Sequence, residues 1–144
     1  MLAKAKKGVL IIMKLMDFVT GIQHVGIPTN DIEETKRFYT SLGFTLVHET
    51  INESGGNIPV AFLQAGDVLI ETYENKRAAM KRGSIDHIAL NVPDIEAAYA
   101  VAKENGFTFL ESDEIVFLPF WEKGIRYFLI EGPNKEPIEF LQKL

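Results

Sequence analysis

The chain has 144 residues, enough for one compact domain or for two very small modules that share a core. Its net charge of -5 gives no basic surface for nucleic acid or for an anionic membrane. It contains no cysteine, which excludes disulfides, thiolate metal ligands and cysteine nucleophiles, and we expect a cytoplasmic protein.

Residues 1–19 form a leader that precedes the recognisable pattern. Lysines stand before a short apolar run, Val9–Met13, as in a signal peptide. The run is too short to span a membrane, Lys14 interrupts it, and no small-residue cleavage site follows. Three interpretations stay open: a mobile tail, an added edge strand, or upstream sequence before a start at Met13 or Met16.

The rest of the chain repeats itself. Residues 22–47 align without a gap on residues 85–110 when the sequence is shifted by 63 positions. The identical pairs are Ile22/Ile85, His24/His87, Asp31/Asp94, Ile32/Ile95, Glu33/Glu96, Gly43/Gly106, Phe44/Phe107 and Thr45/Thr108. We therefore predict one domain over residues 20–144, made of module one (21–75), a linker (76–83) and module two (84–144).

Each module is predicted to begin with a strand and a helix. The strands are Gly21–Ile27 and Ser84–Val92, and the helices with apolar residues at helical spacing are Ile32–Leu42 and Ile95–Asn105. Each helix has N-cap chemistry before it and a glycine where a left-handed C-cap is expected. The capping residues are Asn30 or Asp31 with Gly43, and Asp94 with Gly106.

Runs of β-branched and aromatic residues, separated by turn residues, follow each helix. They predict the strands Phe44–Ile51, Ile58–Gln64 and Val68–Tyr73, then Phe107–Glu111, Ile125–Ile130 and Pro137–Gln142. The fold class is α+β, with two tandem βαβββ modules.

One histidine and one glutamate stand at equivalent places in the two modules. His24 and His87 lie in the first strands, each on the same face as a small residue. Glu71 and Glu139 lie in apolar last strands, where a buried carboxylate needs a cation or a hydrogen-bond network. A single strand histidine is more often a packed residue, but four residues that obey the repeat favour one shared cation.

Two other ionisable residues are interpreted as surface groups. His48 has no histidine partner in the repeat, since its counterpart is Glu111. Asp86, next to His87, is expected on the opposite face of its strand.

The segments QHVGIPTNDIEETKRFYTSLGF, IDHIALNVPDIEAAYAVAKENGF and EGPNKEPIEF resemble the glyoxalase I / bleomycin resistance / extradiol dioxygenase superfamily, also called the vicinal oxygen chelate superfamily. The resemblance covers about Gly21 to Leu144. It implies an eight-stranded, cup-shaped sheet with flanking helices. It also implies metal ligands on the first and last strand of each module, here His24, Glu71, His87 and Glu139.

This ligand set is closest to the glyoxalase I branch. The resemblance implies a metal-dependent lyase or isomerase, like lactoylglutathione lyase, that moves a proton on a substrate with vicinal oxygens through an enediolate. One divalent ion (Ni, Zn, Co, Mn or Fe) would bind per site. Glu139 is the first choice for the catalytic base and Glu71 the second.

The substrate stays open. Val25–Pro28 lacks the arginine that holds glutathione in glyoxalase I, and Asn75 is either a glutathione contact or a turn residue. A methylmalonyl-CoA epimerase-like enzyme would need an acidic residue in Asn57–Leu63, which has none. A small-molecule binding protein without turnover is a further alternative.

An aromatic segment precedes the last hairpin. One interpretation is that it lines the cup, with Arg126 as an anion contact and with Phe117, Leu118, Phe120 and Trp121 as the apolar wall. An equal alternative is an apolar loop that packs on the core or in a dimer interface. The resemblance also implies a homodimer in which one site draws His24 and Glu71 from one chain and the other two ligands from its partner.

Overall fold

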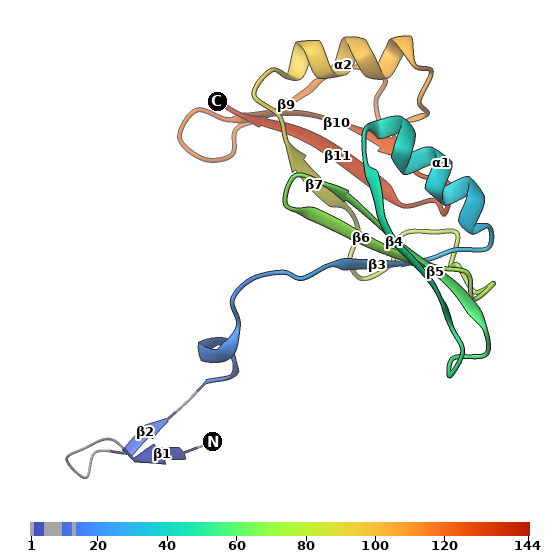
Figure 1. The fold of residues 1–144 in the computed structure, drawn as a ribbon. Helices are drawn as coiled ribbons and strands as arrows, with labels where there is room; N and C mark the ends of the chain where they lie inside the picture. Colours follow the sequence, from blue (N-terminus) through green and yellow to red (C-terminus); the bar gives the residue numbers. More distant parts are fainter. Residues whose placement is uncertain (1, 5–9, 13) are drawn as a thin grey trace.

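The computed structural model describes residues 2–4, 10–12 and 14–144. Two β-sheets, each accompanied by one helix, make up the body of the molecule, and the leader extends away from it (Figure 1).

The leader forms its own small unit in the part that is described. Strands β1 (Leu2–Lys4) and β2 (Leu10–Ile12) pair with each other, and a short 3-10 helix, η1 (Leu15–Phe18), follows. Among the described residues this hairpin joins neither larger sheet, so it is not an added edge strand of the repeat. Of the predicted apolar run, Val9 and Met13 lie outside the described residues. No helix within the described ranges is long and apolar enough to cross a membrane.

The first module has the predicted order of elements. They are β3 (Val25–Pro28), α1 (Ile32–Leu42), β4 (Thr45–Asn52), β5 (Ile58–Ala65) and β6 (Val68–Tyr73). The strands lie in the order β3-β6-β5-β4, with β3 parallel to β6 and the other neighbours antiparallel. The first and last strands of the module are therefore neighbours.

The second module repeats this order with one addition. Its elements are β7 (Ile88–Asn91), α2 (Ile95–Glu104), β8 (Phe109–Leu110), β9 (Val116–Leu118), β10 (Ile125–Glu131) and β11 (Pro137–Lys143). The sheet order is β7-β11-β10-β8, and β9 also pairs with β10. The predicted strand Phe107–Glu111 is thus short, and β9, which was not predicted, pairs with the remaining length of β10. After β8 the chain leaves the sheet at Glu111, whose φ is +65°, and it pairs with β10 again as β9.

Both helices begin and end as the repeat predicts. The carboxylates of Asp31 and Asp94 each accept a hydrogen bond from the backbone N–H three residues further on, at 3.0 and 3.1 Å. Gly43 ends α1 in the left-handed region with φ +105°, which glycine adopts at little cost. In α2 the cap is Asn105, and the left-handed residue is Gly106, one position later.

The first strand of each module starts later than predicted. β3 and β7 start one residue after His24 and His87, so the histidines lie in the segments that lead into the strands. β3 and β7 are edge strands, and each is hydrogen-bonded to a single neighbouring strand, β6 or β11. The paired residues begin at Val25 and Ile88, after the histidines. The predicted α+β fold of two βαβββ modules is confirmed, and the described strands of one chain form a four-stranded and a five-stranded sheet.

One apolar core joins the two modules, with buried residues from both. Helix α1 of the first module also contacts the β10–β11 turn of the second. The hydroxyl of Tyr39, 1% exposed, donates to Glu136 Oε1 at 2.8 Å. The amide of Asn134 donates to Thr35 Oγ1 at 3.0 Å. The Glu136 carboxyl, which accepts the hydrogen bond from Tyr39, is largely removed from water, and this burial raises its pKa.

Candidate metal and substrate site

The first module brings His24 and Glu71 together. The Nε2 atom of the histidine lies 3.0 Å from Glu71 Oε2, and both side chains are partly exposed. Glu71 stands opposite Gly26 in the parallel pair of β3 and β6. A Cβ atom at position 26 would lie 3.8 Å from the same carboxylate oxygen, an ordinary contact distance, so a small residue fits on this side of the pair.

The second module repeats this arrangement with His87 and Glu139. Their Nε2 and Oε2 atoms are 2.9 Å apart, and Glu139 stands opposite Ala89 on β7. Here the carboxylate is buried, with 9% of its side chain exposed. Burial raises the pKa of Glu139; the positive charge of His87 acts to lower this pKa, and the nearby Glu111 acts to raise it.

The residue before each histidine contacts the other ring nitrogen. His24 Nδ1 is hydrogen-bonded to Gln23 Oε1, and His87 Nδ1 lies 2.9 Å from Asp86 Oδ2. Asp86 is exposed, as predicted, but the prediction that it lies on the opposite face is wrong, because it contacts the imidazole and lines the same cavity as His87. Such an outer hydrogen bond is typical of metal-binding histidines, because it directs the opposite nitrogen toward the metal.

The two acceptors around His87 outnumber the single N–H of a neutral imidazole. An ionised carboxylate only accepts hydrogen bonds, and a neutral imidazole has one N–H for the two carboxylates of Asp86 and Glu139. The second ring nitrogen would then face a carboxylate with its lone pair. A second ring proton, a proton on Glu139, or a cation between the two removes this repulsion. The pair is therefore suited to take up an added proton or a cation.

The structure does not gather all four predicted ligands in one chain. Each histidine meets the glutamate of its own module, which gives two separate pairs. Among the described residues, no group of three or more His, Asp or Glu side chains lies close enough together to hold a metal ion.

A cavity of about 340 Å³ lies over the second pair. Its lining includes both His87 and Glu139, together with Leu118, Phe120 and Trp121 from the predicted aromatic segment. Phe117 does not line the cavity. Trp121, which the sequence suggested as a substrate contact, thus lies beside the pair.

The prediction that Arg126 contacts an anion in the site is wrong. Its guanidinium pairs with Glu96 on α2, on the helix side of the sheet. The neighbouring residues Ile125 and Tyr127 line the cavity, and alternation along β10 therefore points Arg126 away from it.

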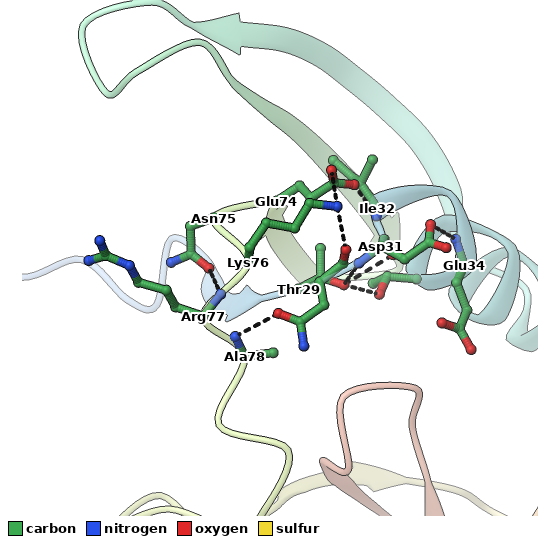
Figure 2. Close-up of polar contacts among 11 residues, drawn as sticks. Thr29, Asp31, Ile32, Glu34, Glu74, Asn75, Lys76, Arg77 and Ala78 are labelled. Carbon is green, nitrogen blue, oxygen red and sulfur yellow. Dashed lines mark hydrogen bonds and ion pairs between the residues drawn. The ribbon is translucent and has the colours of Figure 1, made fainter.

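Asn75 occupies a turn after β6. Its side-chain oxygen accepts a hydrogen bond from the Arg77 backbone N–H at 2.9 Å, as Figure 2 shows. The adjacent Glu74 accepts from the Ile32 N–H at the start of α1, at 2.8 Å. This agrees with the turn interpretation of Asn75 rather than the glutathione contact.

The sequence interpretation missed one pair of residues at the site. His48 lies on the same face as Glu71, since both stand opposite Phe62 in the sheet. Its counterpart Glu111 lines the cavity with His87. The signal was present: these two positions are equivalent under the 63-residue shift, and both are ionisable.

The family comparison agrees with this architecture. The model of the Glyoxalase/Bleomycin resistance protein/Dioxygenase superfamily matches residues 21–116, and the chain belongs to this superfamily. A relative from Bacillus subtilis (strain 168), "Uncharacterized protein YwbC", is 37% identical over 128 residues, which are 85% of this chain and 97% of the relative.

Solved structures show the same fold. A glyoxalase family protein from Enterococcus faecalis is similar with a TM-score of 0.69 and 24% identity, over 86% of this chain and 98% of the other. The fosfomycin resistance protein FosX from Listeria monocytogenes, solved with Mn(II) and sulfate ion, has a TM-score of 0.64 and 13% identity, over 88% and 95% of the two chains.

Proposed function

We propose that the chain is a metal-dependent, glyoxalase-like lyase or isomerase that moves a proton on a small substrate with vicinal oxygens. One observation carries the proposal: the two modules hold equivalent pairs, His24 with Glu71 and His87 with Glu139, at 3.0 and 2.9 Å. We further propose that the protein works in the cytoplasm, in keeping with the absence of cysteine.

The donor set fits a divalent cation. Two ligands at right angles, with metal bonds of about 2.1 Å each, would lie about 3.0 Å apart. Both His–Glu pairs have this separation. Imidazole and carboxylate ligands suit Ni, Zn, Co, Mn or Fe. Mn(II) in FosX, a protein of the same fold, supports a cation of this kind.

We propose that each metal site is shared between two chains of a homodimer. Each pair supplies two ligands, and within one chain the pairs remain apart. A two-fold axis that places the first pair of one chain against the second pair of its partner would complete two identical sites. Each site would then have two histidines and two glutamates.

In the reaction, the protein groups hold and move the proton. A bound cation would supply Lewis-acid chemistry, which polarises neighbouring oxygens of the substrate. Glu139 is our first candidate for the base because its pKa is raised by burial, which makes it a better proton acceptor than an ordinary carboxylate. Glu71 is the second candidate. Ala89 and Gly26 leave space beside these carboxylates.

Metal analysis and an activity assay test this function. The purified protein should bind one divalent ion per chain after reconstitution and convert a hemithioacetal in a chelator-sensitive reaction. Glu139→Gln should lower both metal content and turnover, whereas Glu131→Gln, at the far end of the β10–β11 hairpin, should change neither. Absence of metal after reconstitution, with metal content unchanged in Glu139→Gln, would refute the metalloenzyme.

Mixing two variants tests the shared site. A chain with His24→Ala and Glu71→Gln lacks the first pair, and a chain with His87→Ala and Glu139→Gln lacks the second. Neither homodimer has a complete site. A mixed dimer would regain one of two sites, and with it about half of the metal bound per dimer. If the mixture binds no more metal than the two separate variants, the site is not shared in this way.

A further inference from the structure

The cavity over the second His–Glu pair has an apolar side and an acidic side. Its apolar side includes Leu118, Phe120, Trp121, Tyr127, Leu129 and Leu141. Its volume of about 340 Å³ lies in the range of small-molecule sites, about 300–1,000 Å³. In the free chain Phe120 is 53% and Trp121 73% exposed. Burying such large aromatic surfaces under a ligand is favourable, because each removes apolar area from water.

Two of the six non-glycine residues with positive φ in the described chain line this cavity. Trp121 has φ +61° and Glu111 has φ +65°, values that side chains other than glycine rarely adopt. Strain of this kind persists only where surrounding contacts hold it, and it is common at ligand sites. Glu111 follows β8 and Trp121 follows β9, and both line the same cavity.

The polar side of the cavity is acidic. Asp86, Glu111 and Glu139 line it, and no lysine or arginine of the described chain is among the lining residues. Arg82 and Lys143, which contact lining residues, each have a partner there. Arg82 pairs with Glu111 at 2.8 Å and with Asp86 at 3.7 Å. The ammonium of Lys143 lies 4.7 Å from the centre of the Trp121 ring.

We propose that this cavity binds an uncharged aromatic group of the substrate and rejects polyanionic conjugates, with Glu111 as the residue that enforces the rejection. The inference deepens the proposed function, because it names the substrate class for the same site. Phe120 and Trp121 contact the ring, and Glu111 accepts a hydrogen bond from a neutral hydroxyl. A ligand with several negative charges would lie against three carboxylates, and no lysine or arginine among the described lining residues would offset its charge.

Binding of size-matched probes to the metal-free protein tests the proposal. Equilibrium dialysis after treatment with EDTA compares 2-naphthol, which is neutral, with naphthalene-2,6-disulfonate, a dianion, and with 2-decalol, which is neutral but not aromatic. The wild-type protein should bind 2-naphthol at least tenfold more tightly than either of the others. Equal binding of the disulfonate, or of 2-decalol, would overturn the proposal.

Two matched pairs of variants locate the effect. Phe120→Ala should weaken 2-naphthol binding about tenfold, and Phe117→Ala should not, since Phe117 belongs to the same segment but lies outside the cavity. Glu111→Gln should tighten disulfonate binding about tenfold, and Glu114→Gln, at an exposed position outside the cavity, should leave it unchanged. An equal effect in a variant and its control would contradict the assignment.

The result is separable from the metal hypothesis and from misfolding. All probes are measured without metal. The predicted preference for 2-naphthol can therefore be refuted while the protein still binds metal, and metal binding can be refuted while the preference is found. Thermal unfolding by circular dichroism establishes that each variant is folded. If Phe120→Ala is unfolded, Phe120→Leu removes the ring while keeping an apolar side chain, and it should still weaken 2-naphthol binding.

Discussion

At the scale of single residues, the repeat includes the groups that support the proposed ligands. Gln23 and Asp86 are equivalent under the 63-residue shift, and each contacts the Nδ1 atom of the following histidine. In both modules, the contact to Nδ1 from the preceding residue thus orients Nε2 toward the glutamate. The difference between the modules is charge, because one support is a neutral amide and the other a carboxylate.

Asp86 therefore has a measurable role. Replacing Asp86 by Ala should lower divalent-cation affinity about 10- to 100-fold, the usual cost of removing the outer partner of a metal-bound histidine. Competition with a chromophoric chelator measures this affinity. Asp113→Ala removes an exposed carboxylate that pairs only with Lys103 at 3.8 Å, and it should have no effect. Unchanged affinity in Asp86→Ala would contradict a metal at His87.

A second residue-scale prediction concerns pH and stability. The pKa of Glu136 is raised in the folded protein by burial, above its ordinary value of 4.5. Folding then favours the protonated form, so this contribution to stability is complete below that value and is lost as pH rises through the folded pKa. Glu136→Gln has no such loss. Its free energy of unfolding, relative to wild type, should increase between about pH 4 and about pH 7.

Urea unfolding at a series of pH values measures this difference. The control is Glu122→Gln, at an exposed loop position, which should give a difference independent of pH. A difference for Glu136→Gln that falls as pH rises would show that hydrogen bonds from Tyr39 and Asn134 outweigh burial at this carboxylate.

At the scale of elements, the helices were predictable because their signals are local. Both are capped by an aspartate that the sequence identifies, and α1 spans the predicted residues. Asp31→Ala and Asp94→Ala should each lower the free energy of unfolding by about 1 kcal/mol, because a backbone N–H loses its acceptor. Urea unfolding checks both. Glu53→Ala, in the exposed β4–β5 turn, should cost less than either, and equal costs would argue against capping.

The site was predictable only in part. The repeat alone identifies His24, Glu71, His87 and Glu139, and the structure pairs them within each module. Whether the two His–Glu pairs come together in one site depends on how the modules pack against each other. No local sequence pattern encodes this packing. Arg126 was misassigned although strand alternation from Tyr127 would have turned it toward α2. β9 was missed because the break at Glu111 depends on a left-handed backbone that glycine would normally mark.

At the scale of the whole molecule, the two modules are tied through α1. Tyr39 and Thr35 on this helix bond to Glu136 and Asn134 of the second module. Buried residues of both modules also belong to one core. We therefore expect the modules to unfold together, in a single transition.

The single tryptophan makes this testable, since Trp121 reports on the second module alone. Leu63→Ala, at a position with 0% exposure in the first module, should lower stability by about 2–5 kcal/mol. The urea midpoint seen by Trp121 fluorescence should fall as far as the one seen by far-ultraviolet circular dichroism. Leu46→Ala, at a 38% exposed position of β4, should move both midpoints little. A shift in circular dichroism without a shift in Trp121 fluorescence would mean that the contacts of α1 do not couple the modules, and the two halves of the site would then be held together only across the proposed dimer.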